Sequence, residues 1–238
     1  MEKAKKIKIY IGLFYLLFIG LFLYYFFSKF SLEEITSYDF IKNNREYFFE
    51  LRKSNLFLLA ILFFLFTIIW VLAAGFGSPI AIFGGFIFGK WIGSLIVILG
   101  LSVGASLLYI FANYFLKELI KEKFLIKYKI LETKFKKSEF IYLLIYRFIG
   151  GIPFAISNVL PCIFNVKIFN FFSATLIGIL PQVFLICSIG SGLEKIIETN
   201  LEPPKIIDLI FSPGIYIPII IFACLIIFTI FLRKIFYK

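Results

Sequence analysis

Residues 147–158, RFIGGIPFAISN, decide the fold, because they place an arginine, two adjacent glycines, a proline and an asparagine within an otherwise membrane-like sequence. We interpret this stretch as a helix that is broken at bilayer depth. Irregular backbone is tolerated there only where protein or a water-filled cavity satisfies the freed N–H and C=O groups. A central arginine costs about 2.5–3.5 kcal/mol on insertion scales. The stretch is therefore the first candidate for a functional site.

The amino-acid composition indicates an integral membrane protein. Of the 238 residues, 61% are hydrophobic, 21% are aromatic and only 16% are charged, and the mean hydropathy is +1.00. A membrane-spanning helix needs roughly 20 apolar residues. The apolar runs that approach this length are 7–27, 56–74, 91–116, 169–189 and 215–232. The first run is long and aromatic and lacks a small-residue cleavage site, so we interpret it as a retained anchor rather than a signal peptide.

Charge, histidine and cysteine exclude several classes of function. The net charge is +11, but the basic residues flank the apolar runs, so we predict no nucleic-acid partner. The chain has no histidine, which excludes a Ser-His-Asp triad, a histidine-ligated zinc site and a histidine pH switch. Cys162, Cys187 and Cys224 lack C-x-x-C spacing. We therefore expect neither a metal site nor a cofactor.

Loop charges predict the orientation, because short cytoplasmic loops accumulate Lys and Arg. Segment 117–139 carries eight basic and four acidic residues, and the C-terminus is basic as well. Segment 29–53 balances five basic against five acidic residues, whereas 194–208 carries two basic and four acidic ones. We predict that both termini and segment 117–139 are cytoplasmic. That segment is also amphipathic, so it either lies on anionic headgroups or is a solvated linker.

With this orientation, residues 55–116 and residues 140–192 must each cross the membrane an odd number of times. Each half is too long for one helix, so we predict a re-entrant hairpin and one crossing helix in each. The predicted domains are an N-terminal anchor with an extracytoplasmic segment (1–54), a central domain (55–193), and an extracytoplasmic loop with a C-terminal helix (194–238). Within the central domain we predict hairpin 55–89, transmembrane helix 91–116, cytoplasmic loop 117–139, hairpin 140–164 and transmembrane helix 166–190.

An internal repeat supports this arrangement. A shift of about 74 positions superposes Pro79 on Pro153 and Gly104 on Gly178, together with two further apolar pairs. Inverted repeats with broken helices place a substrate site near the bilayer midplane. The predicted fold is thus an all-α integral membrane protein, an inverted repeat of re-entrant hairpin plus transmembrane helix flanked by terminal transmembrane helices. The alternative is that 56–74 crosses the membrane fully and the identities arise by chance.

The membrane core contains cations without carboxylate partners, because no Asp or Glu occurs in 51–116 or in 140–193. A phosphate is a suitable partner for an unpaired arginine, because the planar guanidinium group can bind it through two hydrogen bonds. Helix N-termini near Pro79 and Pro153 add partial positive charge. The candidate substrate-binding residues are Arg147, Asn158, Pro153, Gln182 and Lys90, and Lys167 is a further cation of the membrane region. The alternatives are snorkelling for the cations and interhelical hydrogen bonds for Asn158 and Gln182.

Small residues indicate close helix packing. Gly89 with Gly93, and Gly100 with Gly104, have the G-x-x-x-G spacing that brings helices together, within the chain or between chains. The spacing is therefore also compatible with a homo-oligomer. The residues that we assign to the hairpins and to packing are Pro79, Gly85, Gly89, Gly104, Gly151 and Gly178.

Two stretches carry a resemblance to a known family. They are SPIAIFGGFIFGKWIGSLIVILGLSVGASLLYIFANY (78–114), and YRFIGGIPFAISN (146–158) followed by GILP (178–181) and Gly190-Ser191. Over about 57–193 the chain resembles the SNARE-associated Golgi protein family, the VTT-domain superfamily that includes bacterial DedA proteins. The resemblance implies two re-entrant hairpins, a bacterial inner membrane or eukaryotic secretory membrane, and a role in polyprenyl-phosphate recycling or phospholipid scrambling.

The chain departs from the family pattern at several positions. The family usually has an Arg near Asn113, a Pro near Gly150 and a Gly near Pro161, and DedA proteins carry membrane carboxylates that are absent here. The chain therefore looks closer to the Golgi-type branch, and the resemblance favours lipid handling over proton-driven antiport.

The first hypothesis for function is a lipid translocase or scramblase of the bacterial plasma membrane, in which Arg147 grips the headgroup of an anionic or phosphate-bearing lipid. The alternative is a scaffold that organises membranes or helps to assemble other complexes without transporting anything. An enzyme is disfavoured, because the membrane region offers no His, Asp or Glu for acid–base chemistry.

Overall fold

The computed structural model describes residues 38–115, 138–149 and 152–199, together with isolated positions between 10 and 28, at 136 and between 211 and 227. The ordered elements in these ranges are all helices. Most of the predicted anchor 7–27, the basic segment 117–139 and the predicted helix 215–232 lie outside the described residues, as does Gly151.

The first half of the fold is formed by two long, interrupted helices. Helix α3 spans Tyr38–Leu72 and has non-helical backbone at Asn55, whose Oδ1 accepts a hydrogen bond of 3.0 Å from the Leu58 N–H. Asn55 thus acts as an N-cap for the apolar part of α3. After a turn at 73–76, α4 spans Gly77–Phe115 and is broken at Gly89, which has φ +76° and ψ 170°. This backbone conformation is accessible almost only to glycine, which explains the residue at the break.

The second half consists of shorter helices. Their bounds are Glu139–Ile149 for α7, Phe154–Val159 for α8, Leu160–Phe164 for the 3-10 helix η1, Ile168–Gly178 for α9 and Leu180–Thr199 for α10. Asn165 ends η1 in the left-handed conformation with φ 51°. The single helix predicted over 166–190 is instead two helices that bend by 42° at Ile179, and α10 runs on to Thr199. Pro181 explains the bend, because proline fits the first turn of a new helix but not a helix interior.

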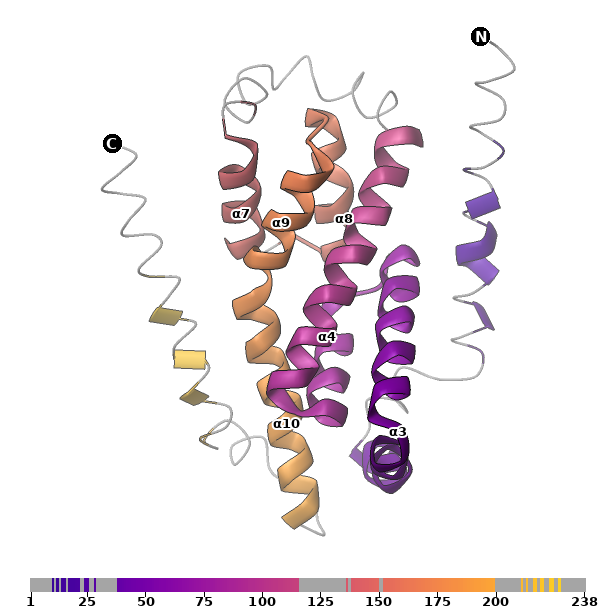
Figure 1. The fold of residues 1–238 in the computed structure, drawn as a ribbon, viewed down its shortest axis with the longest axis vertical. Helices are drawn as coiled ribbons and strands as arrows, with labels where there is room; N and C mark the ends of the chain where they lie inside the picture. The colour runs from indigo at the N-terminus through magenta and orange to yellow at the C-terminus, as the bar shows by residue number, and fades with distance from the viewer. Residues whose placement is uncertain are drawn as a thin grey trace.

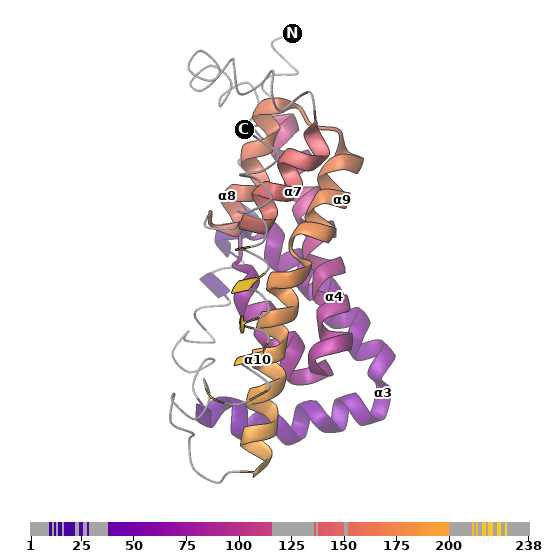
Figure 2. The same cartoon turned by 90° about the vertical axis from the view of Figure 1, so that its left-hand side faces the viewer.

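Helices of both halves lie at each end of the molecule (Figures 1 and 2). The start of α3, the Gly89 break of α4 and the end of α10 lie at one end, which we call the α10 end. Helices α7 and α8 and the start of α9 lie at the other, which we call the α7 end. The turn that joins α3 to α4 lies between these ends. The relation of the halves as an inverted repeat, and their re-entrant placement in a bilayer, stay predictions.

Helix length and composition fit an integral membrane protein. Glu46–Leu72 and Gly77–Phe115 are each long and apolar enough to span a membrane. The bent pair Ile168–Gly178 and Leu180–Lys195 adds a third span if it crosses as one unit. Many large apolar side chains of α3 and α4 are exposed, among them Phe57, Leu62, Trp91 and Leu95. In a membrane these side chains would face lipid.

Glycines bring α4 and α10 into backbone contact. A Cβ atom added at Gly85 would lie 2.0 Å from the Cys187 carbonyl oxygen, and one added at Gly190 would lie 2.1 Å from the Ile82 carbonyl oxygen. Gly104 packs in the same way on Val71 of α3. Gly89 differs, since an added Cβ would meet nothing within 4 Å. Gly85 and Gly104 therefore allow close helix packing, whereas Gly89 provides backbone conformation.

Candidate functional site: a buried arginine beside a cavity between two broken helices

Arg147 lies in the last turn of α7 and is only 5% exposed. Its Nε donates to Thr175 Oγ1 at 3.1 Å, which joins α7 to α9. Its Nη1 donates to Ser157 Oγ at 2.5 Å and its Nη2 to Asn158 Oδ1 at 2.7 Å, which joins α7 to α8. All three acceptors are neutral. The arginine therefore links the two legs of the broken segment that we singled out in the sequence.

Aromatic rings cover the guanidinium group. Its Cζ lies 5.1 Å from the ring centre of Phe171, 5.5 Å from that of Phe154 and 5.9 Å from that of Tyr146. Ring faces carry partial negative charge and attract a cation at these distances. Gly178 makes room for the arginine stem, because an added Cβ would lie 2.5 Å from Arg147 Cβ. The buried positive charge is thus held by ring faces and neutral oxygens.

Two amides complete this network. The Gln182 Nε2 donates to the backbone oxygens of Arg147 at 3.1 Å and Phe148 at 2.9 Å. These carbonyls belong to the last turn of α7 and have no partner within that helix. Asn158 is fully buried, and its Nδ2 has no hydrogen-bond partner among the described residues, although its Oδ1 accepts from Arg147. Gln182 therefore fixes the end of α7, and Asn158 keeps an unused donor.

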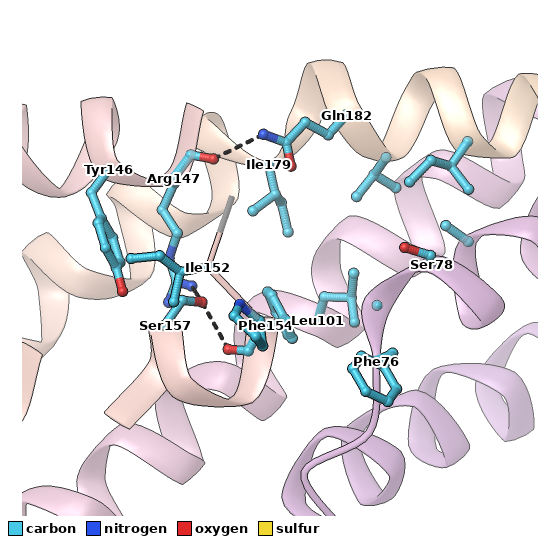
Figure 3. A pocket seen from close by; sticks show the side chains of 15 residues that line it. Phe76, Ser78, Leu101, Tyr146, Arg147, Ile152, Phe154, Ser157, Ile179 and Gln182 are labelled. Carbon is cyan, nitrogen blue, oxygen red and sulfur yellow. Dashed lines mark hydrogen bonds between the residues drawn. The ribbon is translucent and has the colours of Figure 1, made fainter. Parts of the chain in front are cut away.

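A cavity of about 250 Å³ lies next to this network (Figure 3). Arg147, Tyr146 and Ser157 line one side of it, and Phe76 and Ser78, at the turn before α4 and the start of that helix, line the other. The remaining wall combines the second break with α4 and the first turns of α10. Its further lining residues are Gly77, Ala81, Leu101, Ile152, Pro153, Phe154, Ile179, Gln182, Val183 and Ile186. The turn before α4 and the break before α8 thus adjoin the same cavity.

The start of α4 adds polarity to the cavity. Gly77 and Ser78 are its first two residues, so their N–H groups belong to the first four of the helix, which have no intrahelical partner. Such N–H groups carry partial positive charge and favour an anion. None of the lining residues is an Asp, Glu or Lys, so Arg147 is the only lining residue with a full charge. The cavity therefore favours a ligand that carries negative charge.

The structure brings most of the predicted binding residues together. Arg147, Pro153 and Gln182 line the cavity, and Asn158 lies directly behind it. Lys90 is instead exposed beside the Gly89 break, with its Nζ 5.7 Å from the ring centre of Trp91. Lys167 is exposed just before α9, where its backbone N–H donates to Glu139 Oε2 at 3.2 Å. The two lysines therefore lie away from the cavity.

Four residues of the site were not predicted from the sequence: Ser78, Tyr146, Ser157 and Thr175. Ser78, Tyr146 and Ser157 are sequence neighbours of the predicted residues Pro79, Arg147 and Asn158. Their positions could therefore have indicated that they belong to the site. Thr175 carried no such signal, because a threonine in an apolar helix usually bonds to its own backbone, as Thr67 does with the Phe63 oxygen at 2.8 Å.

Comparison with known proteins identifies the domain. No solved structure matches the chain. Residues 76–192 match the model of the VTT domain. The match begins at the last residue of the turn before α4 and ends in α10, so it includes the α7–α8 break and every residue that lines the cavity. The chain therefore contains a VTT domain, the domain of the SNARE-associated Golgi protein and DedA family.

Proposed function

We propose that the protein is a lipid translocase that moves phosphate-bearing lipids between the two leaflets of its membrane. In this proposal the cavity takes the lipid headgroup while the acyl or prenyl chains stay in the bilayer. The substrate is a phospholipid or a polyprenyl phosphate, because the two share the phosphate group that the cavity would recognise. The family and the spanning helices support a membrane transporter, and the chemistry of the cavity supports the substrate class.

One observation carries the proposal: a buried arginine without a carboxylate partner among the described residues lines a cavity between two broken helices. A guanidinium group has five N–H donors, and three of them bind neutral oxygens here. Each terminal nitrogen keeps one further N–H. Guanidinium N–H groups form strong, charge-assisted hydrogen bonds with phosphate oxygens. A phosphate would also supply the negative charge that this environment lacks.

The cavity supports transport better than chemistry on the lipid. Hydrolysis of a phosphate ester needs a nucleophile with an acid–base pair or a metal. The lining residues include no Asp, Glu or Cys, and the chain has no histidine. Ser78, Ser157 and Gln182 are suited to hydrogen bonding with phosphate oxygens, which is a binding role. We therefore propose that the lipid leaves the protein unchanged.

The proposal is tested by lipid translocation in proteoliposomes. The probes are a fluorescent phospholipid and a polyprenyl phosphate, each compared with empty vesicles. The variants are Arg147→Lys, which keeps the charge, and Arg147→Gln, which removes it. We expect wild-type protein to accelerate translocation, Arg147→Lys to retain part of this activity and Arg147→Gln to lose it. Equal activity of wild type and Arg147→Gln at equal incorporation would overturn the proposal.

Arg147 also holds the fold together, so a second variant must leave its hydrogen bonds intact. Ser78 is exposed at the start of α4 and lines the cavity without a contact to the arginine. Ser78→Trp should fill the cavity and block translocation of both probes. The matched control is Ser54→Trp, at an exposed serine of α3 far from the cavity lining. Unimpaired translocation by Ser78→Trp would contradict a headgroup route through this cavity.

A further inference from the structure

Beyond the cavity, one face of α4 carries a stripe of polar side chains toward the α7 end. The stripe consists of Ser102, Ser106, Tyr109 and Asn113, at helical intervals of four, three and four residues. These intervals place all four residues on one side of the helix. The apolar residues between them, Ala105 and Ala112, pack against α7, η1 and α9, so the stripe faces the second half of the fold. It begins next to Leu101, which lines the cavity.

Two members of the stripe are bonded within the protein, because Ser106 Oγ donates to the Ser102 oxygen at 2.8 Å and the Tyr109 hydroxyl donates to the Val166 oxygen at 2.7 Å. The side-chain oxygens of the other two members are not bonded in this way. Ser102 Oγ and Asn113 Oδ1 have no hydrogen-bond partner among the described residues, and the same holds for Asn158 Nδ2 in the adjoining α8. Ser102 and Asn158 are both fully buried. Buried polar groups in proteins are almost always bonded, to protein or to ordered water. Unused donors and acceptors on both sides of one interface therefore point to water or to a polar ligand between α4 and α8.

The α10 end of the molecule is different. There, Gly85 and Gly190 bring the backbones of α4 and α10 together, which leaves no room between these helices. The buried hydroxyl groups at this end are satisfied by their own helices, because Ser94 donates to the Lys90 oxygen and Ser188 donates to the Phe184 oxygen at 2.7 Å. Among the described residues of this interface, no buried hydroxyl group lacks a hydrogen-bond partner.

We propose that the route of the lipid headgroup continues from the cavity along the Ser102–Asn113 stripe, between α4 and the α8–η1 segment, toward the α7 end. Water accompanies the phosphate along this route and bonds to the stripe when no phosphate is present. The α4–α10 interface is the closed gate at the opposite end in this conformation. The inference rests on the proposed function and adds the path that the same substrate takes.

Two native cysteines allow access of water to the two ends to be compared without any substitution. Cys162 lies in η1, fully buried against the α4 face that carries the stripe. Cys187 lies in α10, fully buried at the glycine contact with α4. The experiment treats the full-length wild-type protein in liposomes, on both sides of the membrane, with a small anionic methanethiosulfonate. Peptide mass spectrometry then measures the rate of modification at each cysteine.

We expect Cys162 to be modified about tenfold faster than Cys187, because thiol reactivity follows access to water and the route opens beside Cys162. Equal rates, faster modification of Cys187, or protection of both thiols would overturn the proposed route. Lipid translocation is measured in the same vesicles. Active protein with an unreactive Cys162 would refute the route and leave the proposed function standing, whereas absent translocation would refute both.

A pair of substitutions tests the stripe itself. Ser102→Ala removes a hydroxyl that has no partner in the described part of the chain, so we expect unchanged or higher thermal stability together with translocation several-fold slower. Ser188→Ala is the control, because it removes a buried hydroxyl at the closed end and should leave translocation unchanged. Wild-type translocation by Ser102→Ala would contradict a hydrated route along the stripe.

Discussion

At the scale of single residues, Arg147 has two roles that a sequence cannot separate. An arginine at bilayer depth predicts a functional site because its burial is costly, and Arg147 lines a cavity. The same side chain also holds α7, α8 and α9 together through three hydrogen bonds. The link between Arg147 and the Asn158 region was predictable from a polar pair across a helix break. The link to Thr175 was not, because it depends on how α9 packs on α7.

Thr175 tests the structural role of Arg147. Thr175→Val keeps the volume of the side chain and removes the acceptor of the arginine Nε, so we expect a loss of about 1.5–3 kcal/mol in the free energy of unfolding. The control is Thr67→Val, at an equally buried threonine whose hydroxyl bonds only to its own helix. Its expected loss is about 1 kcal/mol or less. Denaturant titration in detergent micelles measures both, and equal losses would contradict the account of this contact.

At the scale of helices, glycine and proline predicted most of the interruptions. The breaks at 73–76, at Gly89 and before α8 all lie at sequence positions rich in these residues. The bend at Ile179 was missed, because the apolar run of α9 and α10 continues through it and Pro181 alone does not tell where a new helix begins. Asn55 was also missed, since its capping role requires the helix that follows it. Local sequence thus locates strong breaks, whereas bends inside apolar runs depend on packing.

Two glycines of α4 should respond differently to alanine. Gly89→Ala meets no steric contact but forces a backbone conformation that suits glycine alone, so we expect a loss of about 1–3 kcal/mol in unfolding free energy. Gly85→Ala places a methyl group against the Cys187 backbone and must separate α4 from α10. We expect it to be more destabilising than Gly89→Ala. Thermal unfolding of both variants in detergent compares them, and a milder effect at Gly85 would argue against the close helix contact.

At the scale of the whole molecule, the two ends of the fold have different characters. The glycine contacts close the α10 end, and unpartnered polar atoms mark the interface toward the α7 end. The all-helical class and the presence of spanning helices followed from composition and apolar run length. A shared site for the two breaks was expected from the internal repeat, but the residues that build the cavity wall were not, because they come from helices that are far apart in sequence. The orientation in the membrane stays a prediction, since the charged segment 117–139 lies outside the described residues for the most part.

The chemistry of the cavity also predicts how transport depends on pH. None of the lining residues is an Asp, a Glu or a Lys, and the chain has no histidine, so no lining group has an ordinary pKa between about pH 6 and pH 8. We expect translocation of a phosphodiester lipid to be constant over this range and unaffected by a protonophore. A phosphodiester is chosen because it does not itself titrate there. A rate that collapses when the proton gradient is removed would contradict this expectation.

The central claim, that a lipid headgroup enters the cavity between the two breaks, is tested most directly by photocrosslinking. A phospholipid with a photoreactive group beside its phosphate is incorporated into proteoliposomes, irradiated, and located on the protein by peptide mass spectrometry. We expect labelling of the peptides that contain Ser78 and residues 152–157, and loss of this labelling in Ser78→Trp. Labelling confined to the exposed apolar faces of α3 and α4, unchanged in Ser78→Trp, would contradict it.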